Sequence, residues 1–215
     1  MNPTISRPAL ILGSGEDVPF TAPTLKNDNT LIICADGGAK LARTWRLTPK
    51  IILGDQDSLD APTKEYHRAQ GVVFRRVPTE KDETDLDLAV EYALQQGATS
   101  LTLVGAWGSR IDHALGNVEL LYRLALMGLP NQILTRSHRL SAFCTRFRAT
   151  AQKDSIVSLL PLSPEVTNVR TRGLLYPLNG VTLKKGSTLT ISNVATATEI
   201  IVEMANGVLL IVMRQ

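Results

Sequence analysis

Cysteine is scarce in this 215-residue sequence, and long apolar runs are missing. The two cysteines, Cys34 and Cys144, do not form a CxxC spacing, which argues against a cysteine-bound metal. Both stand in apolar, strand-like surroundings, so we expect buried free thiols in a reducing cytoplasm. No run of residues is apolar enough to span a bilayer, and the run in MNPTISRPALILG is too short for a signal peptide. We therefore expect a cytoplasmic protein without membrane contact.

The excess of positive charge is also small. The formal net charge is +3 and the pI about 9.0, and no basic helix or RNP-like aromatic motif accompanies this weak field. We therefore expect no nucleic-acid partner. The alternative, an RNA-binding protein, predicts strongly salt-dependent binding through arginines. Its candidate arginines are Arg75, Arg76, Arg136, Arg139, Arg146 and Arg148.

What the chain does contain, over its first two-thirds, is short apolar runs alternating with segments of helical period. This order predicts an α/β domain with a mostly parallel sheet and flanking helices. The runs are apolar on both sides of the pleat, so both faces of the sheet should be covered. The predicted strands are residues 9–13, 31–35, 51–54, 72–77, 101–105 and 132–135.

Two helices are predicted between these strands. The first has Thr84 as its N-cap and stops at Gly97. The second runs over residues 112–127 and stops at Gly128. The apolar residues expected to face the core are Leu86, Ala89, Val90, Ala93 and Leu94 in the first helix and Leu120, Leu121, Leu124 and Ala125 in the second.

After about residue 151 the helical period disappears and short apolar runs follow one another. The runs SIVSLLPL, GSTLTISN, TEIIVEM and GVLLIVM are separated by Gly, Pro and Asn, which predicts an all-β, sandwich-like domain. Asn206-Gly207 should form a two-residue hairpin turn between the last two runs. We therefore predict an α/β domain over residues 1–150, followed by a smaller β domain over residues 151–215.

Polar clusters follow four of the predicted strands directly. Because the ligand crevice of an open parallel sheet lies outside the carboxyl ends of its strands, these clusters should converge. They are ADGG after residues 31–35, DQDS after 51–54, EKDETD after 72–77 and GSRIDH after 101–105.

Gathering many carboxylates in one crevice is unfavourable unless cations compensate their charge. Mg²⁺ is the natural choice, because it prefers oxygen ligands and is usually held by one or two carboxylates plus substrate phosphates. Gly37 and Gly38 allow backbone N–H groups to approach an anion, and Lys81 and Arg110 supply positive charge. Mg²⁺ with a polyphosphate explains both signs of charge. The carboxylates concerned are Asp36, Asp55, Asp57, Asp82, Asp85 and Asp112.

Each cluster alone also has a simpler interpretation. Acids at the start of a helix suit its dipole, which would account for Asp85 and Asp87 but less well for Asp82. GDQDS and ADGG could be polar turns after strands. Arg110, His113 and Asn117 could form an exposed polar helix face. The argument for a site depends on the clusters occurring together at strand ends.

The order ADGGA, GDQDS, KDETD, GSRIDHALGN, RGLLYPL and ISN resembles the thiamin pyrophosphokinase family. The resemblance runs from Leu31 to the C-terminus, and no Walker A motif competes with it. It implies an α/β nucleotide domain with a C-terminal β-sandwich, assembled as a homodimer with thiamin near the subunit interface. It also implies Mg²⁺-dependent transfer of the pyrophosphoryl group of ATP to the hydroxyethyl oxygen of thiamin, giving thiamin diphosphate and AMP.

The resemblance also implies roles for individual residues. The carboxylates that organise metal and pyrophosphate, and are counted as catalytic, would be Asp55, Asp57, Asp82 and Asp85. The ATP-binding residues would be Asp36, Gly37, Gly38, Arg110, Asp112, His113 and Asn117. The thiamin-binding residues would be Lys81, Thr84, Ser192 and Asn193.

The sequence departs from the family pattern at several places, including Gln56, where an aromatic residue is usual, and Ser109, which replaces the second glycine of GGR. These changes leave the carboxylates intact. Two alternatives stay open: a related pyrophosphokinase with another hydroxyalkyl acceptor, such as hydroxymethyl-dihydropterin, and a catalytically silent nucleotide-binding module. We further hypothesise that Asp82 or Asp85 accepts or orients the proton of the attacking hydroxyl.

Overall fold

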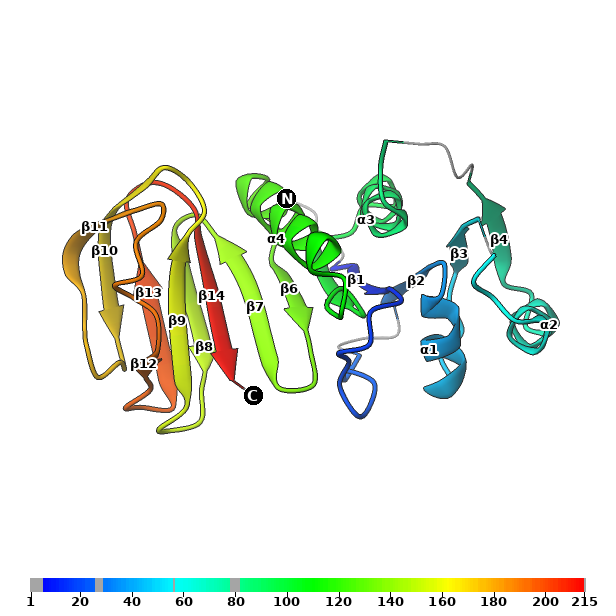
Figure 1. The fold of residues 1–215 in the computed structure, drawn as a ribbon, viewed down its shortest axis with the longest axis horizontal. Coiled ribbons are helices and arrows are strands. Elements are labelled where there is room, and N and C mark those ends of the chain that lie inside the picture. The colour runs from blue at the N-terminus through cyan, green and yellow to red at the C-terminus, as the bar shows by residue number, and fades with distance from the viewer. Residues whose placement is uncertain (1–5, 26–28, 56, 78–81, 215) are drawn as a thin grey trace. The chain divides into compact units, whose positions relative to one another are not determined.

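The computed structural model describes residues 6–25, 29–55, 57–77 and 82–214. Strands and helices alternate from β2 to β6, and only strands follow (Figure 1). The helices are α1 (Gly38–Thr44), α2 (Ala61–Ala69), α3 (Asp85–Gln95) and α4 (Ile111–Leu126). The strands are β1 (Pro8–Leu12), β2 (Leu31–Ala35), β3 (Ile51–Gly54), β4 (Val73–Arg76), β5 (Ser100–Val104), β6 (Asn131–Leu134), β7 (His138–Phe143), β8 (Arg146–Thr150), β9 (Ile156–Pro161), β10 (Glu165–Arg172), β11 (Asn179–Lys184), β12 (Asn193–Val194), β13 (Glu199–Glu203) and β14 (Leu209–Arg214).

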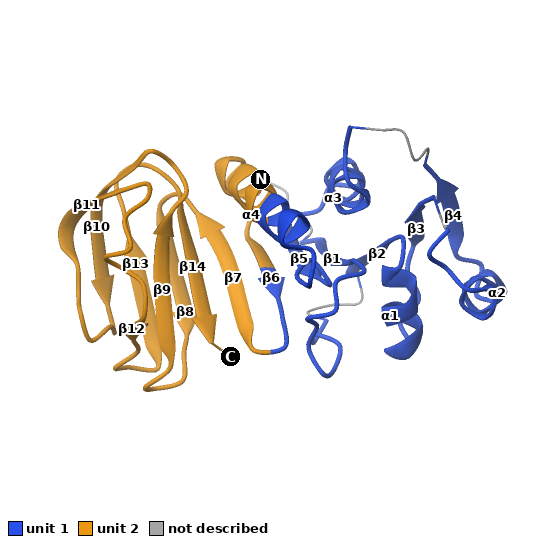
Figure 2. Ribbon diagram, viewed as in Figure 1, with its two compact units in different colours: residues 1–117, 133–136 blue, residues 118–132, 137–215 orange. Residues whose placement is uncertain are grey.

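The chain divides into two compact units (Figure 2). Unit 1 comprises residues 1–117 and 133–136, and unit 2 comprises residues 118–132 and 137–215. Strands β7 and β8 precede residue 151 but belong to unit 2, because they pair with β14 and β13. A separation of ATP and thiamin functions between residues 1–150 and 151–215 stays a prediction. Among the described residues no helix is both long and apolar enough to cross a membrane.

Unit 1 is built on a parallel sheet, as predicted. The strand order is β5-β1-β2-β3-β4, and neighbouring strands pair in parallel throughout. Figure 1 shows α3 on one side of β1 and β2 and α1 on the other. Every residue of β2 and β3 is buried, which confirms the prediction that helices cover both faces there.

Strand β4 differs from its neighbours, and the prediction that both faces of the sheet are covered is wrong for this strand. It is the edge strand, its residues are half-buried or exposed, and Val73 is 52% exposed. The run looked buried because it begins with two valines and a phenylalanine. Arg75 and Arg76 in its second half suit an edge strand, where charge discourages pairing with another chain.

The two predicted helices are confirmed. Helix α3 begins after Thr84, whose side-chain oxygen accepts a hydrogen bond from the N–H of Asp87 at 3.1 Å. Leu86, Ala89, Val90 and Ala93 of its apolar stripe are buried, while Leu94 is half-buried; the helix packs against β1, β2 and β3, and Gly97 follows its end with φ +75°. Gly128 ends α4 in the same way, with φ +70°.

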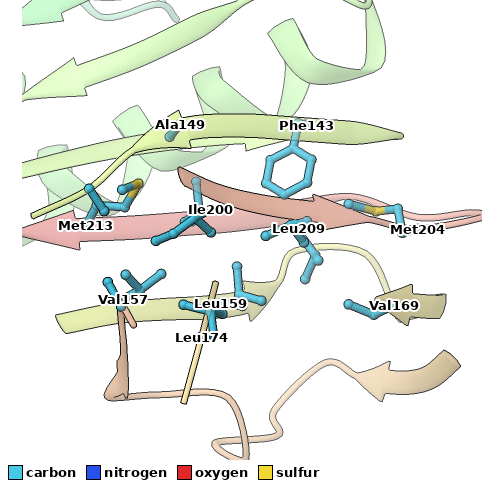
Figure 3. Close-up of a cluster of buried hydrophobic side chains, with 14 of the residues drawn as sticks. Phe143, Ala149, Val157, Leu159, Val169, Leu174, Ile200, Met204, Leu209 and Met213 are labelled. Carbon is cyan, nitrogen blue, oxygen red and sulfur yellow. The ribbon is translucent and has the colours of Figure 1, made fainter. Parts of the chain in front are cut away.

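Unit 2 is a β-sandwich, again as predicted. One sheet contains β12-β9-β14-β7 and the other contains β11-β10-β13-β8, and neighbouring strands in each of these orders pair antiparallel. Alternate residues of both sheets point into a shared core (Figure 3). Strands β7, β9 and β14 contribute Phe143, Val157, Leu159, Leu209 and Met213, and strands β8, β10 and β13 contribute Ala149, Val169 and Ile200.

Two predictions for this unit are wrong. Asn206-Gly207 does not join a hairpin, because β13 pairs with β8 and β10 while β14 pairs with β7 and β9. The turn instead carries the chain from one sheet to the other, with Gly207 at φ +101°. GSTLTISN forms turns and only the short β12, because left-handed backbone at Gly186, φ +88°, and at Ser192, φ 60°, interrupts an extended strand.

The two cysteines are both free. Cys34 is fully buried in β2, and this burial raises the pKa of its thiol above the usual range. Cys144 is only partly buried, so the prediction of burial holds for Cys34 alone; the Cys144 thiol donates to the carbonyl of Ala125 at 3.1 Å.

Candidate active site

A pocket opens at the carboxyl ends of β1, β2 and β5 in unit 1. Its walls come from the loops after these strands and from the first turns of α3 and α4, as expected for a ligand crevice of a parallel sheet. Its lining residues are Gly13, Ser14, Gly15, Glu16, Ala35, Asp36, Thr84, Asp85, Leu86, Gly105, Ala106, Trp107, Gly108, Arg110, His113, Ala114 and Asn117.

Glycines let the loops after β1 and β5 lie directly against each other. The N–H of Gly13 donates to the carbonyl of Val104 at 2.7 Å, and that of Gly15 to Gly105 at 2.8 Å. A Cβ on Gly15 would lie 2.3 Å from the carbonyl oxygen of Trp107, and Gly105 has φ +67°. Only glycine fits these positions without moving backbone, so one wall of the pocket is formed largely by main chain.

Asp36 connects the loops that follow β2 and β3. It has a left-handed backbone with φ 42°, which places its side chain in the pocket lining. One of its carboxylate oxygens accepts a hydrogen bond from the hydroxyl of Ser58. A Cβ on Gly54 would lie 2.8 Å from the Cβ of Asp36, so the first residues after β3 pass close to it.

The predicted carboxylates of GDQDS follow β3 but do not line the pocket. Asp55 accepts a hydrogen bond from the N–H of Asp57 at 2.9 Å, which closes a local turn. Asp57 has a long ion pair with Arg76, at 4.0 Å, and both side chains are 75% exposed. An ion pair this exposed contributes little to stability.

The acidic stretch before α3 reaches the pocket through two residues. Thr84 and Asp85 line it, so the first turn of α3, with the positive end of the helix dipole, begins at the pocket. Asp82 is exposed on the approach to this helix, and Lys81 lies outside the described residues.

The cap of α3 gives a direct test of this local structure. Replacing Thr84 with alanine removes the acceptor for the Asp87 N–H and should lower the free energy of unfolding by about 1 kcal/mol. Urea denaturation followed by circular dichroism measures the change. Thr84→Ser keeps the hydroxyl and should restore most of the loss; equal losses for the serine and alanine variants would contradict a capping role.

Arg110, which directly precedes α4, lines the pocket together with His113 and Asn117 of α4, as their three- and four-residue spacing predicted. Asn117 is buried, and its side-chain N–H donates to the carbonyl of Ala106 at 2.7 Å, fixing α4 to the loop after β5. Arg110 pairs with Asp112 at 2.6 Å. The hydrogen bond from Arg110 is the main cause that lowers the pKa of the Asp112 carboxyl, although both side chains are about two-thirds exposed.

Sequence reasoning missed the loop after β1, which contributes Gly13, Ser14, Gly15 and Glu16 to the lining. A signal was present, because GSGE follows an apolar strand directly, as the other clusters do. Trp107 also lines the pocket.

Ser192 and Asn193 lie in unit 2, at the start of β12. Ser192 has a left-handed backbone, with φ 60°, and its N–H donates to the Ser158 hydroxyl at 2.9 Å. The Asn193 side chain is buried and bonds both the N–H and the carbonyl of Tyr176, at 3.0 and 2.8 Å. It therefore fixes the backbone at Tyr176, whose own side chain is 66% exposed.

No cluster of three or more His, Cys, Asp or Glu side chains able to hold a metal occurs within the part of the chain that the structure describes. Two oxygen donors that do lie together are the carboxylate of Asp36 and the hydroxyl of Ser58.

Comparison with known proteins decides the family. Residues 22–132 match the family described as thiamin pyrophosphokinase, catalytic domain, and residues 145–209 match its vitamin B1 binding domain. The chain belongs to the thiamin pyrophosphokinase family. The two matched ranges cover most of the sequence, and they contain the motifs ADGGA to ISN on which the resemblance was based.

Individual members of the thiamin pyrophosphokinase family are similar over nearly their full length. A thiamine pyrophosphokinase of Bacillus subtilis is 28% identical over 189 residues, covering 86% of this chain and 88% of the relative. Thiamine pyrophosphokinase 1 of Arabidopsis thaliana is 26% identical, and the match covers 96% of this chain and 86% of the relative. The crystal structure from B. subtilis superposes with a TM-score of 0.86 at 25% identity, covering 98% and 99%. The crystal structure of the thiamin pyrophosphokinase from Geobacillus thermodenitrificans superposes with a TM-score of 0.83 at 28% sequence identity. The match covers 96% of this chain and 97% of that one.

Proposed function

We propose that this chain transfers the pyrophosphoryl group of ATP to the hydroxyethyl oxygen of thiamin, giving thiamin diphosphate and AMP. The observation that carries the proposal is the pocket at the ends of β1, β2 and β5. It combines main-chain walls with Asp36, Asp85 and Arg110, and it lies in a chain that belongs to the thiamin pyrophosphokinase family. Both signs of charge in one crevice suit a polyphosphate with its cation.

ATP occupies this pocket. Arg110 and the first N–H groups of α3 supply positive potential for phosphates, while the narrow main-chain wall allows close approach. His113 and Asn117 of α4 line the pocket on the same side as Arg110, which directly precedes this helix, and complete that side of the ATP site. The ATP-binding residues are Asp36, Gly37, Gly38, Arg110, Asp112, His113 and Asn117.

The donor set fits Mg²⁺. All of the carboxylates concerned offer hard oxygen ligands, and Mg²⁺ is commonly held by one or two protein carboxylates together with substrate phosphates, so a three-residue cage is not needed. Asp36 and Asp55, from neighbouring strand ends, are the first candidates, with Asp57, Asp82 and Asp85. When bound, Mg²⁺ supplies neutralisation of the phosphate charge.

The chain's own residues then position the transfer. A bond forms between the thiamin oxygen and the β-phosphorus, the bond from the β-phosphorus to the oxygen bridging to the α-phosphorus breaks, and AMP leaves. Asp82 or Asp85 accepts or orients the hydroxyl proton. Asp85 is the stronger candidate, because it lines the pocket at the positive end of α3. Arg110 remains charged and stabilises the phosphate oxygens throughout.

Thiamin is held by Lys81, Thr84, Ser192 and Asn193, and a second copy of the chain completes this site in a homodimer. What supports a dimer is the exposed apolar surface beside Asn193 on unit 2. Leu175 is 51% exposed, Tyr176 66% and Ile191 43%, and such neighbouring apolar side chains are usually covered by a ligand or partner. The chain functions in the cytoplasm.

Product analysis tests the proposal. The purified protein is incubated with ATP, Mg²⁺ and thiamin, and the products are separated by chromatography. We expect thiamin diphosphate and AMP in equal amounts. AMP formed with a hydroxymethylpterin but not with thiamin would overturn the choice of acceptor. ATP binding without turnover of either compound would favour a nucleotide-binding module.

A further inference from the structure

Glu16, in the loop after β1, holds the loop after β5 through both of its carboxylate oxygens. One oxygen accepts the backbone N–H of Ser109 at 2.9 Å, and the other accepts the Ser109 hydroxyl at 2.9 Å. These two bonds join residues that are 93 positions apart in the sequence. They form a bidentate contact on an exposed side of the pocket.

Several backbone hydrogen bonds join the loops after β1 and β5. The N–H of Gly15 donates to Gly105 and that of Asp17 donates to Trp107 at 3.2 Å, so the Glu16 contact closes the end of a short ladder. A Cβ on Gly108 would lie 2.1 Å from a carboxylate oxygen of Glu16. The glycine therefore leaves the space in which the carboxylate sits.

The hydrogen bonds from Ser109 also favour the ionised form of Glu16. The backbone N–H of Ser109 is the main cause that lowers the pKa of the Glu16 carboxyl, and the carboxylate is the form that accepts both hydrogen bonds. Hydrogen bonds to an ionised acceptor are stronger than those between neutral groups. The contact can therefore hold a loop even though it is exposed to solvent.

Ser109 is followed directly by Arg110, which lines the pocket and pairs with Asp112 at the start of α4. Arginine has a long side chain, so the position of its guanidinium group depends on a fixed backbone at this residue. Asp112 constrains the guanidinium from one side, and the Glu16 contact constrains the backbone from the other. A looser loop would let Arg110 sample positions from which it cannot reach a phosphate.

We propose that Glu16 is a positioning residue of the nucleotide site, which fixes the loop after β5 through Ser109 and thereby places Arg110 for the phosphates of ATP. The inference rests on the proposed function, because it takes Arg110 as an ATP-binding residue. Glu16 itself, an anion already occupied by two hydrogen bonds, does not contact the phosphates.

Steady-state kinetics separates this role from a general contribution to folding. Glu16→Ala should raise the KM for ATP about tenfold, the loss typical of a hydrogen bond to a charged group, and leave the KM for thiamin within about twofold. Ser109→Ala keeps the backbone N–H and should show a smaller rise. Glu16→Gln keeps one acceptor and should recover part of the loss. Glu65→Ala, which removes an exposed carboxylate of α2 outside the pocket, is the matched control and should change neither KM.

Trp107 reports on the loop directly. The sequence has two tryptophans, so Trp45→Phe leaves Trp107 as the only indole. In this background Glu16→Ala should shift the Trp107 emission and its accessibility to acrylamide, because the residue lies in the loop that Glu16 holds. Titrating ATP into each variant gives the affinity without turnover, and the Glu16→Ala/Ser109→Ala double variant should lose less than the sum of the single variants.

Two results would overturn the inference. One is a folded Glu16→Ala protein that binds ATP as tightly as the unchanged protein, and the other is equal rises in the KM values for ATP and thiamin. If Glu16→Ala does not fold, the same criteria apply to Ser109→Ala. Failure of the proposed function looks different, because the unchanged protein would then give no thiamin diphosphate while the ATP affinities could still be compared.

Discussion

Gly38→Ala is expected to destabilise the protein by about 3 kcal/mol or more, enough to prevent stable folding of many domains. A Cβ at this position would lie 1.9 Å from the carbonyl oxygen of Leu12 and 2.4 Å from its carbonyl carbon. These are backbone atoms of β1 in the centre of the sheet, so they cannot move aside as a flexible side chain would. The loss is measured by urea denaturation followed by circular dichroism.

Gly116→Ala is the matched control, because the same methyl group is added in a different place. Gly116 lies within α4, is exposed, and a Cβ there would have nothing within 4 Å. Alanine is a better helix former than glycine, so this variant should be about 0.5–1 kcal/mol more stable. If Gly38→Ala unfolded at the same urea concentration as the unchanged protein, the close contact between α1 and β1 would be disproved.

Gly38 also illustrates what could be predicted from the sequence. Asp36-Gly37-Gly38 was recognised as a cluster after a buried strand, and the bounds of β2 and β3 were predicted to the residue, because an unbroken apolar run ends at a polar turn. The contact of Gly38 with Leu12 could not be predicted. It joins residues that are distant in the sequence, and a glycine in a turn has several local explanations.

The same distinction explains the failures in the fold. Asn206-Gly207 has the local chemistry of a hairpin, but its flanking strands are drawn into opposite sheets by the core that both sheets share. Strand β4 is apolar at its start yet lies at the edge, where Arg75 and Arg76 of its second half are exposed; its apolar start favoured a buried strand. In both cases packing between segments that are distant in the sequence outweighs the local preference for a hairpin or a buried strand.

For the candidate site, the sequence predicted which residues lie near the pocket more reliably than which side chains contact one another. Thr84, Asp85, Arg110, His113 and Asn117 all reach the pocket, because each follows a strand or starts a helix at the same end of the sheet. Asp55 and Asp57 follow a strand too, yet β3 lies farther along the sheet and their side chains form a local turn instead. The Glu16 contact with Ser109 was missed, since nothing in either loop alone indicates the other.

Asp85→Asn should lower kcat about 100-fold or more, because removing a group that accepts a proton in the transition state usually has an effect of that size. The side chain keeps its shape, and Asp85 is only half-buried at the first position of α3, so the fold should be retained. Turnover is measured as thiamin diphosphate formed per second at saturating ATP, Mg²⁺ and thiamin. The Mg²⁺ dependence of the rate is recorded in parallel.

Asp87→Asn is the control that gives this experiment its meaning. Both acids lie in the first turn of α3 and interact favourably with the same helix dipole, but only Asp85 lines the pocket. The two variants should therefore lose similar, small amounts of stability, of the order of 0.5 kcal/mol, while only Asp85→Asn loses turnover. If Asp85→Asn kept near-normal turnover with an unchanged Mg²⁺ dependence, Asp85 would have only the structural role that Asp87 has, and the proton would have to pass to Asp82.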